Sequence, residues 1–220
     1  LLHAMDMDSL LKIDSLLISH THIDHVKDMM FWGDLIFGQR PSIKVHGAGD
    51  VLESIKKHLF NWVIWPDFSS IPTKDNPVFK FIPHKRGDSF EIDGGYKIKS
   101  VEVNHTVPSS AFFVEKDSKS ILYSSDTTTT DKVWEEANND DNLKVIFMEI
   151  SFSNKLQAVA DASKHYSPAT LAVDLQKIKK DIPIYLYHIK PSVYDEVVKE
   201  VKKLKDDRLI FASNKKIIEI

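Results

Sequence analysis

Cysteine is absent from the 220-residue sequence. This absence excludes disulfide bonds, zinc sites built on thiolates and a cysteine nucleophile. Histidine and the carboxylates are then the strong metal ligands that remain, and the chain carries 10 histidines. Any metal site must therefore be built from nitrogen and oxygen ligands alone.

A strong excess of charge and a long apolar run are also absent. The formal net charge of -3 argues against a surface dominated by nucleic-acid binding, although a local basic patch could be hidden in that average. No apolar run reaches the roughly 20 residues that span a bilayer, and no charged-then-apolar leader is visible. These absences favour a cytoplasmic protein without membrane contact, but the location stays open because the chain begins at Leu1 rather than at Met.

The composition is that of an ordinary globular protein, with 42% hydrophobic and 28% charged residues. We predict one domain over residues 1–220, with an aromatic and proline-rich insert at about 60–81. The insert has four readings: a lid, a base-stacking wall, a dimer contact, or an irregular segment packed on the core.

A cluster of metal-ligand side chains lies near the start of the chain. Three histidines and one aspartate occur in the stretch His20-Thr21-His22-Ile23-Asp24-His25, after a short apolar strand-like run and before a helix-like segment. Burying four such groups together is costly unless something pairs with them. In an extended segment His20 and His22 leave the same face, whereas Asp24 and His25 follow the turn and point elsewhere. The stretch therefore predicts two adjacent metal positions.

The rest of the chain alternates short strands with amphipathic helices. The architecture that we expect is two mixed β-sheets packed together with helices outside. Predicted helices cover residues 4–14, 26–37, 50–60 and 133–138, a segment that opens at Ser167, and 192–204. Predicted strands cover residues 15–19, 43–46, 89–92, 96–103, 111–115, 120–124, 145–148, 184–187, 209–212 and 216–220, with a turn at Gly47 and Gly49.

Three further ligand-type residues follow predicted strands: His105, Asp126 and His188. Strand ends are where loops hold functional groups over a rigid sheet, so these residues are candidates to complete a two-metal site. With the first cluster they form the order His-x-His-x-Asp-His, a distant His, an Asp and a last His. This pattern resembles the metallo-β-lactamase superfamily over nearly the whole chain.

The resemblance implies an α/β (α+β) fold, a four-layer αββα sandwich, and two divalent metal ions. Zinc is expected, with Mn2+ or Fe2+ as alternatives. His20, His22 and His105 resemble the ligands of the first metal, Asp24, His25 and His188 resemble those of the second, and Asp126 resembles the carboxylate that bridges both.

Two departures from the family pattern stand out. Ser125 occupies a position that is usually glycine. An Asp-containing strand motif normally precedes the first cluster and has no counterpart here, which leaves open whether N-terminal strands of the fold are lacking.

Within the superfamily, the sequence looks most like the class II 3',5'-cyclic-nucleotide phosphodiesterases. The distinguishing feature is His188-Ile189-Lys190-Pro191, accompanied by Glu149-Ile150-Ser151-Phe152 and His165-Tyr166-Ser167-Pro168. The resemblance implies hydrolysis of cyclic AMP or cyclic GMP to 5'-nucleotides, by in-line attack of a hydroxide that bridges the two ions.

The same resemblance suggests catalytic roles. His165 would be the general acid for the departing 3' oxygen, held by Glu149, and Asp24 belongs to the catalytic set as well as to the ligands. Lys190 either contacts a phosphate or is simply solvated. The expected partner is a small cyclic nucleotide, and a homodimer is left open.

Two other functions remain. One is a tRNA 3'-processing endonuclease like ribonuclease Z, or another hydrolase of the metallo-β-lactamase fold. Ribonuclease Z shares the ligands, an acidic residue like Glu149 and a histidine like His165, but usually carries an exosite arm for tRNA that we do not find. Only this reading requires a nucleic-acid partner. A metal-binding sensor or scaffold without catalysis is the third reading.

Overall fold

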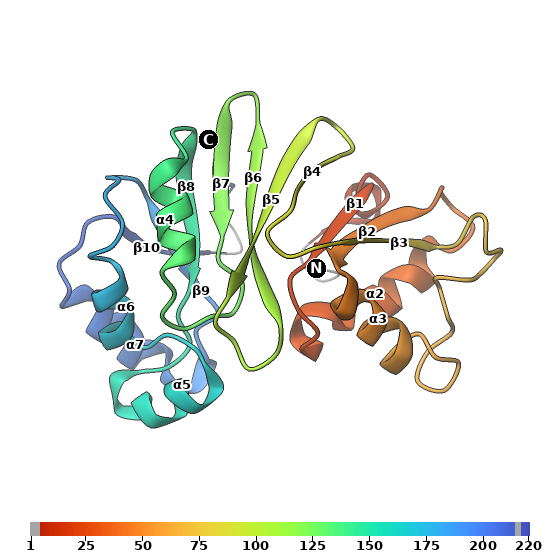
Figure 1. Cartoon of the computed structure of the whole chain (residues 1–220). Helices are drawn as coiled ribbons and strands as arrows, with labels where there is room; N and C mark the ends of the chain where they lie inside the picture. Colours follow the sequence, from red (N-terminus) through yellow and green to blue (C-terminus); the bar gives the residue numbers. More distant parts are fainter. Residues whose placement is uncertain (1–4, 214–216) are drawn as a thin grey trace. The chain divides into compact units, whose positions relative to one another are not determined.

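The computed structural model describes residues 5–213 and 217–220. The chain divides into two compact units, residues 1–86 and 87–220. Each unit has its own sheet, its own helices and its own hydrophobic core (Figure 1).

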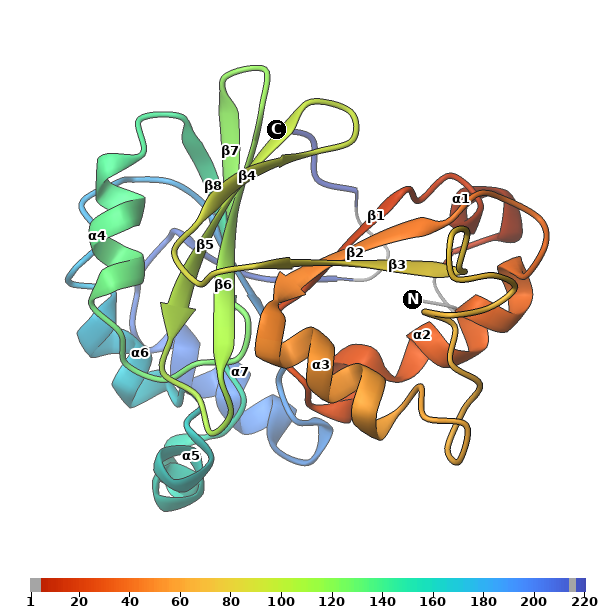
Figure 2. The same cartoon turned by 45° about the vertical axis from the view of Figure 1, so that its right-hand side comes forward.

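The first unit holds a three-stranded sheet in the order β1-β2-β3. Both strand pairs are parallel, so each connection must cross over the sheet, and helices α2 and α3 lie in these crossovers on one side of it (Figure 2). The prediction of two mixed sheets is therefore wrong for this sheet. Its elements are α1 (Met7–Leu10), β1 (Ser15–Ile18), α2 (Ile23–Ile36), β2 (Ile43–Ala48), α3 (Gly49–His58) and β3 (Phe79–His84).

Much of the aromatic, proline-rich segment belongs to the core of the first unit. Phe60, Phe68 and Phe79 are at most 2% exposed, and Phe79 begins a strand that we did not predict. A Cβ on Gly33 of α2 would lie 2.3 Å from the Phe68 ring, so glycine lets that ring pack against the helix. The buried part of the segment agrees with the reading as a stretch packed on the core, while Trp62 is 65% exposed.

The second unit holds a seven-stranded sheet in the order β10-β9-β8-β7-β6-β5-β4. Strands β4 to β7 pair antiparallel and β7 to β10 pair parallel, so this sheet is mixed, as predicted. Its elements are β4 (Ser89–Ile92), β5 (Tyr96–Val103), β6 (Ser109–Lys116), β7 (Lys119–Tyr123), α4 (Lys132–Asn139), β8 (Leu143–Glu149), α5 (Gln157–Ser163), α6 (Pro168–Asp174), β9 (Ile184–Tyr187), α7 (Tyr194–Lys202) and β10 (Leu209–Phe211).

Helices α4, α6 and α7 bury Trp134, Leu171 and Val197 in one core with the large sheet. Helix α6 starts where predicted, because Ser167 caps it in a capping box and Pro168 occupies its first turn. Strands β7, β8 and β9 run parallel, so their carboxyl ends meet at one edge of the sheet. That edge is where the second unit carries most of its candidate site residues.

Several predicted boundaries are wrong. Gly47 lies within β2 and Gly49 begins α3, so there is no turn between them. Residues 217–220 form no strand, and Lys216 lies outside the described residues. The helix predicted over 192–204 is a short 3-10 turn at Pro191–Val193 followed by α7. No helix within residues 5–213 and 217–220 has both the length and the apolar character needed to cross a bilayer.

Candidate metal centre

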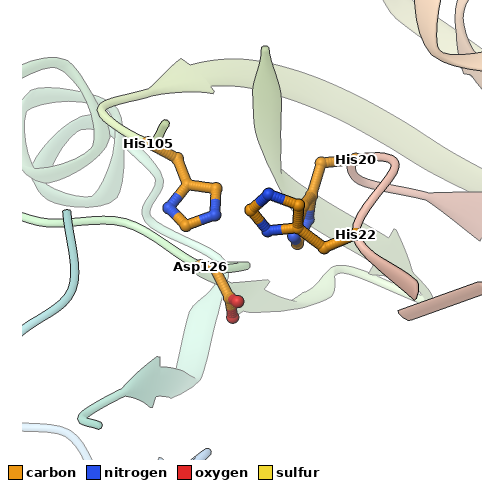
Figure 3. Close-up of side chains that lie close together, drawn as sticks. All are labelled: His20, His22, His105 and Asp126. Carbon is orange, nitrogen blue, oxygen red and sulfur yellow. The ribbon is translucent and has the colours of Figure 1, made fainter. Parts of the chain in front are cut away.

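The ligand-type residues of the first unit come from the turn between β1 and α2. His20 follows β1 and is fully buried, and His22 is the N-cap of α2. The ring centroid of His20 lies 4.9 Å from that of His22 and 4.2 Å from that of His25. Figure 3 shows the rings of His20 and His22 side by side on one loop, as their alternation predicts. A single tight turn thus gathers three imidazoles.

Asp24 sits in the first turn of α2, where the helix dipole favours a negative charge. Its side chain is 50% exposed, and its Oδ2 lies 3.8 Å from Nε2 of His25. The carboxylate is therefore held beside His25 without being buried.

His105 lies two residues after β5 in the second unit and is 6% exposed. Its Nδ1 is 3.2 Å from the backbone oxygen of Lys164, and the Lys164 ammonium donates to the His105 backbone oxygen at 3.2 Å. A carbonyl only accepts, so Nδ1 carries the hydrogen and Nε2 is the nitrogen left to bind a metal. Lys164, at the left-handed end of α5, therefore holds His105 from both sides.

Asp126 is 1% exposed and follows β7 after a sharp turn. Ser125 has φ 58, a left-handed conformation that favours glycine. The serine hydroxyl lies 3.1 Å from that of Ser109, and the Ser124 hydroxyl donates to the Ser125 backbone oxygen at 2.8 Å. The turn that glycine usually makes in this family is thus present with serine. Figure 3 includes both Asp126 and His105.

His188 directly follows β9 and also has a positive φ, 69°. Its Nε2 lies 3.5 Å from Oδ2 of Asp126, and its Nδ1 lies 2.9 Å from the Ser151 hydroxyl. The Nζ atom of Lys190 is 3.5 Å from the same Nε2. Asp126 and His188, predicted as members of one site, are therefore neighbours within the second unit.

Glu149 and His165 form a buried pair. Oε1 of Glu149 lies 2.9 Å from Nδ1 of His165, and the Thr127 N–H donates to the same oxygen at 3.2 Å. One ligand-type atom each of Glu149, His165 and His188 lie within 4.8 Å of one another. Burial raises the pKa of the fully buried Glu149 carboxyl well above its usual range, and the charge of Asp126 raises it further.

Sequence reasoning missed two residues of this region. Ser151 contacts Glu149, His165 and His188 through one hydroxyl, and Lys164 holds His105. Position 151 follows Glu149 by two in an extended stretch, so a shared face could have suggested Ser151. Nothing in the sequence marks Lys164, which acts largely through its backbone.

The donors fit a divalent metal ion. All are imidazole nitrogens or carboxylate oxygens, which suit zinc, manganese or iron. Nδ1 of His20, His105 and His188 lies 3.1, 3.2 and 2.9 Å from an oxygen of Ser19, Lys164 and Ser151. Metal-ligating histidines are typically oriented in this way, with the other ring nitrogen on the metal.

A family model described as the beta-lactamase superfamily domain matches residues 2–211. The chain belongs to this family and has the metallo-β-lactamase fold, as the sequence predicted.

A curated protein of Yersinia pestis, named "Probable 3',5'-cyclic-nucleotide phosphodiesterase", is 26% identical over 208 residues. The match covers 82% of this chain and 58% of that protein, so the chain spans little more than half the length of this relative.

Solved structures show the same fold at low identity. Unliganded yeast PDE1 matches with a TM-score of 0.77 at 18% identity, over 90% of this chain and 66% of that chain. The metallo-β-lactamase fold protein YhfI of Bacillus subtilis matches with a TM-score of 0.71 at 17% identity, over 92% and 76%. The short form of human tRNase Z matches with a TM-score of 0.60 at 16% identity, over 84% and 75%.

Proposed function

We propose that the protein is a two-metal phosphodiesterase that hydrolyses 3',5'-cyclic nucleotides to 5'-nucleotides. The observation that carries this proposal is the buried Glu149–His165 pair beside His188, where the stretch His188-Ile189-Lys190-Pro191 begins. Many hydrolases share the metal ligands and ribonuclease Z shares the pair, but its last ligand usually lies in a different sequence context. The name of the Yersinia pestis relative supports the substrate class.

The ligand assignment is part of the proposal. His20, His22 and His105 would hold one ion, Asp24, His25 and His188 would hold the other, and Asp126 would be a ligand of both. The expected ions are two divalent metals, and zinc is the metal that we favour. They would lower the pKa of a shared water and stabilise charge on the attacking and leaving oxygens. Asp24 counts among the catalytic residues because its carboxylate would help to hold one of the two ions that act on the water.

His165 supplies the proton in this scheme. A water loses one proton to solvent and its oxygen becomes bonded to phosphorus, the bond between phosphorus and the 3' oxygen breaks, and the 5' ester remains. The departing 3' oxygen takes a proton from Nε2 of His165, while Glu149 holds Nδ1 at 2.9 Å. Solvent returns a proton to His165 after the step. Burial of both side chains keeps this geometry fixed, since His165 is 7% exposed and Glu149 0%.

A ribonuclease Z-like activity on precursor tRNA is the alternative. The fold match to human tRNase Z favours it, and the proposed ligands would serve both reactions. Only this alternative would require a nucleic-acid partner.

The test uses purified full-length chain reconstituted with zinc. We expect turnover of cyclic AMP or cyclic GMP to the 5'-monophosphate, together with cleavage of bis(p-nitrophenyl) phosphate. Cleavage of precursor tRNA without cyclic-nucleotide turnover would replace the proposal with the alternative. Cleavage of the model diester alone would eliminate the cyclic-nucleotide substrate, and two bound metals without any hydrolysis would favour the non-catalytic reading.

A further inference from the structure

We propose that Ser151 is a positioning residue whose single hydroxyl orients both the proposed metal ligand His188 and the proposed acid His165. Its consequence for catalysis, through the acid and the metal ligand, rests on the proposed function. Its structural part concerns only which ring nitrogen of each histidine carries hydrogen.

The backbone of Ser151 joins the two segments that carry these histidines. Its N–H donates to the Tyr166 backbone oxygen at 3.0 Å, and its backbone oxygen accepts from the Lys190 N–H at 3.1 Å. Tyr166 is the neighbour of His165, and Lys190 lies two residues after His188. Because Ser151 is fully buried at the end of β8, its hydroxyl has a fixed place between the two rings.

The Ser151 hydroxyl lies within hydrogen-bond distance of four atoms. The distances are 2.9 Å to Nδ1 of His188, 3.2 Å to Nδ1 of His165, 3.1 Å to Oε2 of Glu149 and 3.4 Å to the backbone oxygen of His188. A hydroxyl has one hydrogen to donate and two lone pairs to accept with. The His188 backbone oxygen can only accept, and so can Oε2 of a Glu149 carboxylate, so the hydroxyl donates its hydrogen to one of these oxygens and can accept an N–H from each ring.

This arrangement assigns both tautomers. Each Nδ1 carries hydrogen, so Nε2 of His188, which accepts from the Lys190 ammonium at 3.5 Å, is the nitrogen left for a metal, and Nε2 of His165 is the nitrogen for proton transfer. Outer groups that fix ligand tautomers commonly change metal affinity by about 10- to 100-fold when removed. Ser151 would therefore fix the tautomer of one ligand and, together with Glu149, hold the ring of the acid.

Ser153 offers a matched control in the same segment. It is also fully buried, but its Oγ has no hydrogen-bond partner among the described residues. Removing the Ser153 hydroxyl therefore removes a buried oxygen without touching either histidine.

The experiment compares S151A, S151T and S153A in the full chain. Nitrogen-15 NMR of the histidine rings in metal-free protein reports the tautomers, and chelator competition reports zinc affinity. We expect hydrogen on Nδ1 of both His165 and His188 in the wild type, in S153A and in S151T. In S151A we expect a mixed tautomer at His188 and a 10- to 100-fold weaker affinity for one zinc ion.

Unchanged tautomers and unchanged zinc affinity in S151A would overturn the inference. Should S151A fail to fold, S151V replaces it, because valine matches the shape of threonine without the hydroxyl and S151T remains the comparison. The tautomers and the zinc affinity are both measured without substrate, so their outcome does not depend on phosphodiesterase activity. A changed tautomer in a protein that turns over no cyclic nucleotide would leave the Ser151 inference standing and remove the proposed function.

Discussion

The two units hold their candidate ligands in opposite ways. In the first unit, His20, His22, Asp24 and His25 come from one six-residue turn, and Asp24 is half exposed. In the second unit, His105, Asp126 and His188 come from separate strand ends and are buried or nearly so. Local chain geometry is enough to build the first cluster, whereas the second depends on the order of strands in the sheet.

The support around the two clusters differs as well. The His20 ring lies 3.1 Å from the hydroxyl of the adjacent Ser19. The rings of His105 and His188 are held by Lys164 and Ser151, which lie 59 and 37 positions away in sequence. Precise placement of ligands normally comes from such surrounding hydrogen bonds. This difference between the two units predicts that side chains of the second unit also position ligands and supply the acid.

The largest effect is expected at Asp126, the carboxylate proposed to contact both ions. D126A should lower kcat/KM by about 10³-fold or more and reduce bound metal, because the proposal gives neither ion another shared ligand. Metal analysis and the diester assay measure the two effects. D117N, at an exposed turn position, is the control and should behave as wild type. A D126A protein with full metal content and activity would show that Asp126 is not the shared ligand.

H165A should give the next largest effect. Loss of a general acid lowers kcat about 10²- to 10⁴-fold for a poor leaving group such as a 3' alkoxide. The loss should be much smaller for bis(p-nitrophenyl) phosphate, whose leaving group needs little protonation, and zinc content should stay as in the wild type. H58A, on an exposed helix position, is the matched control. Lost zinc in H165A would make His165 a ligand rather than an acid.

The comparison also explains what could be predicted from sequence. The spacing of His20 and His22 and the presence of a helix after them follow from local periodicity, so both were predicted, although α2 begins at Ile23 and not at residue 26. His105, Asp126 and His188 could be found because each comes near a strand end, although nothing in the sequence specifies the pairing of β7, β8 and β9. Ser151 and Lys164 were missed because their contacts depend on that pairing. Strand β3 was missed because prolines and aromatic residues masked its pattern.

A change at Lys164 should affect zinc affinity less, and it distinguishes backbone contacts from side-chain contacts to a ligand histidine. K164A removes the ammonium contact to the His105 backbone oxygen but keeps the carbonyl that accepts from Nδ1. Zinc affinity should therefore weaken by less than about tenfold, which is less than for S151A. Chelator competition measures both variants, with K155A, at an exposed lysine, as the control. A loss in K164A that equals or exceeds that in S151A would contradict this ordering.

The smallest effect is expected at the turn before Asp126. Ser125 and Ser118 have the same φ, 58°, but Ser118 is exposed in the β6–β7 turn, whereas the Ser125 hydroxyl faces that of Ser109 at 3.1 Å. Glycine relieves the left-handed strain at both sites, and at position 125 it also removes a hydrogen bond worth about 1 kcal/mol. S118G should raise the free energy of unfolding by up to about 1 kcal/mol, whereas S125G should change it by less, because the two effects oppose each other. Urea unfolding of the metal-free chain measures both, and a larger gain in S125G than in S118G would show that the Ser109 contact contributes nothing to the turn.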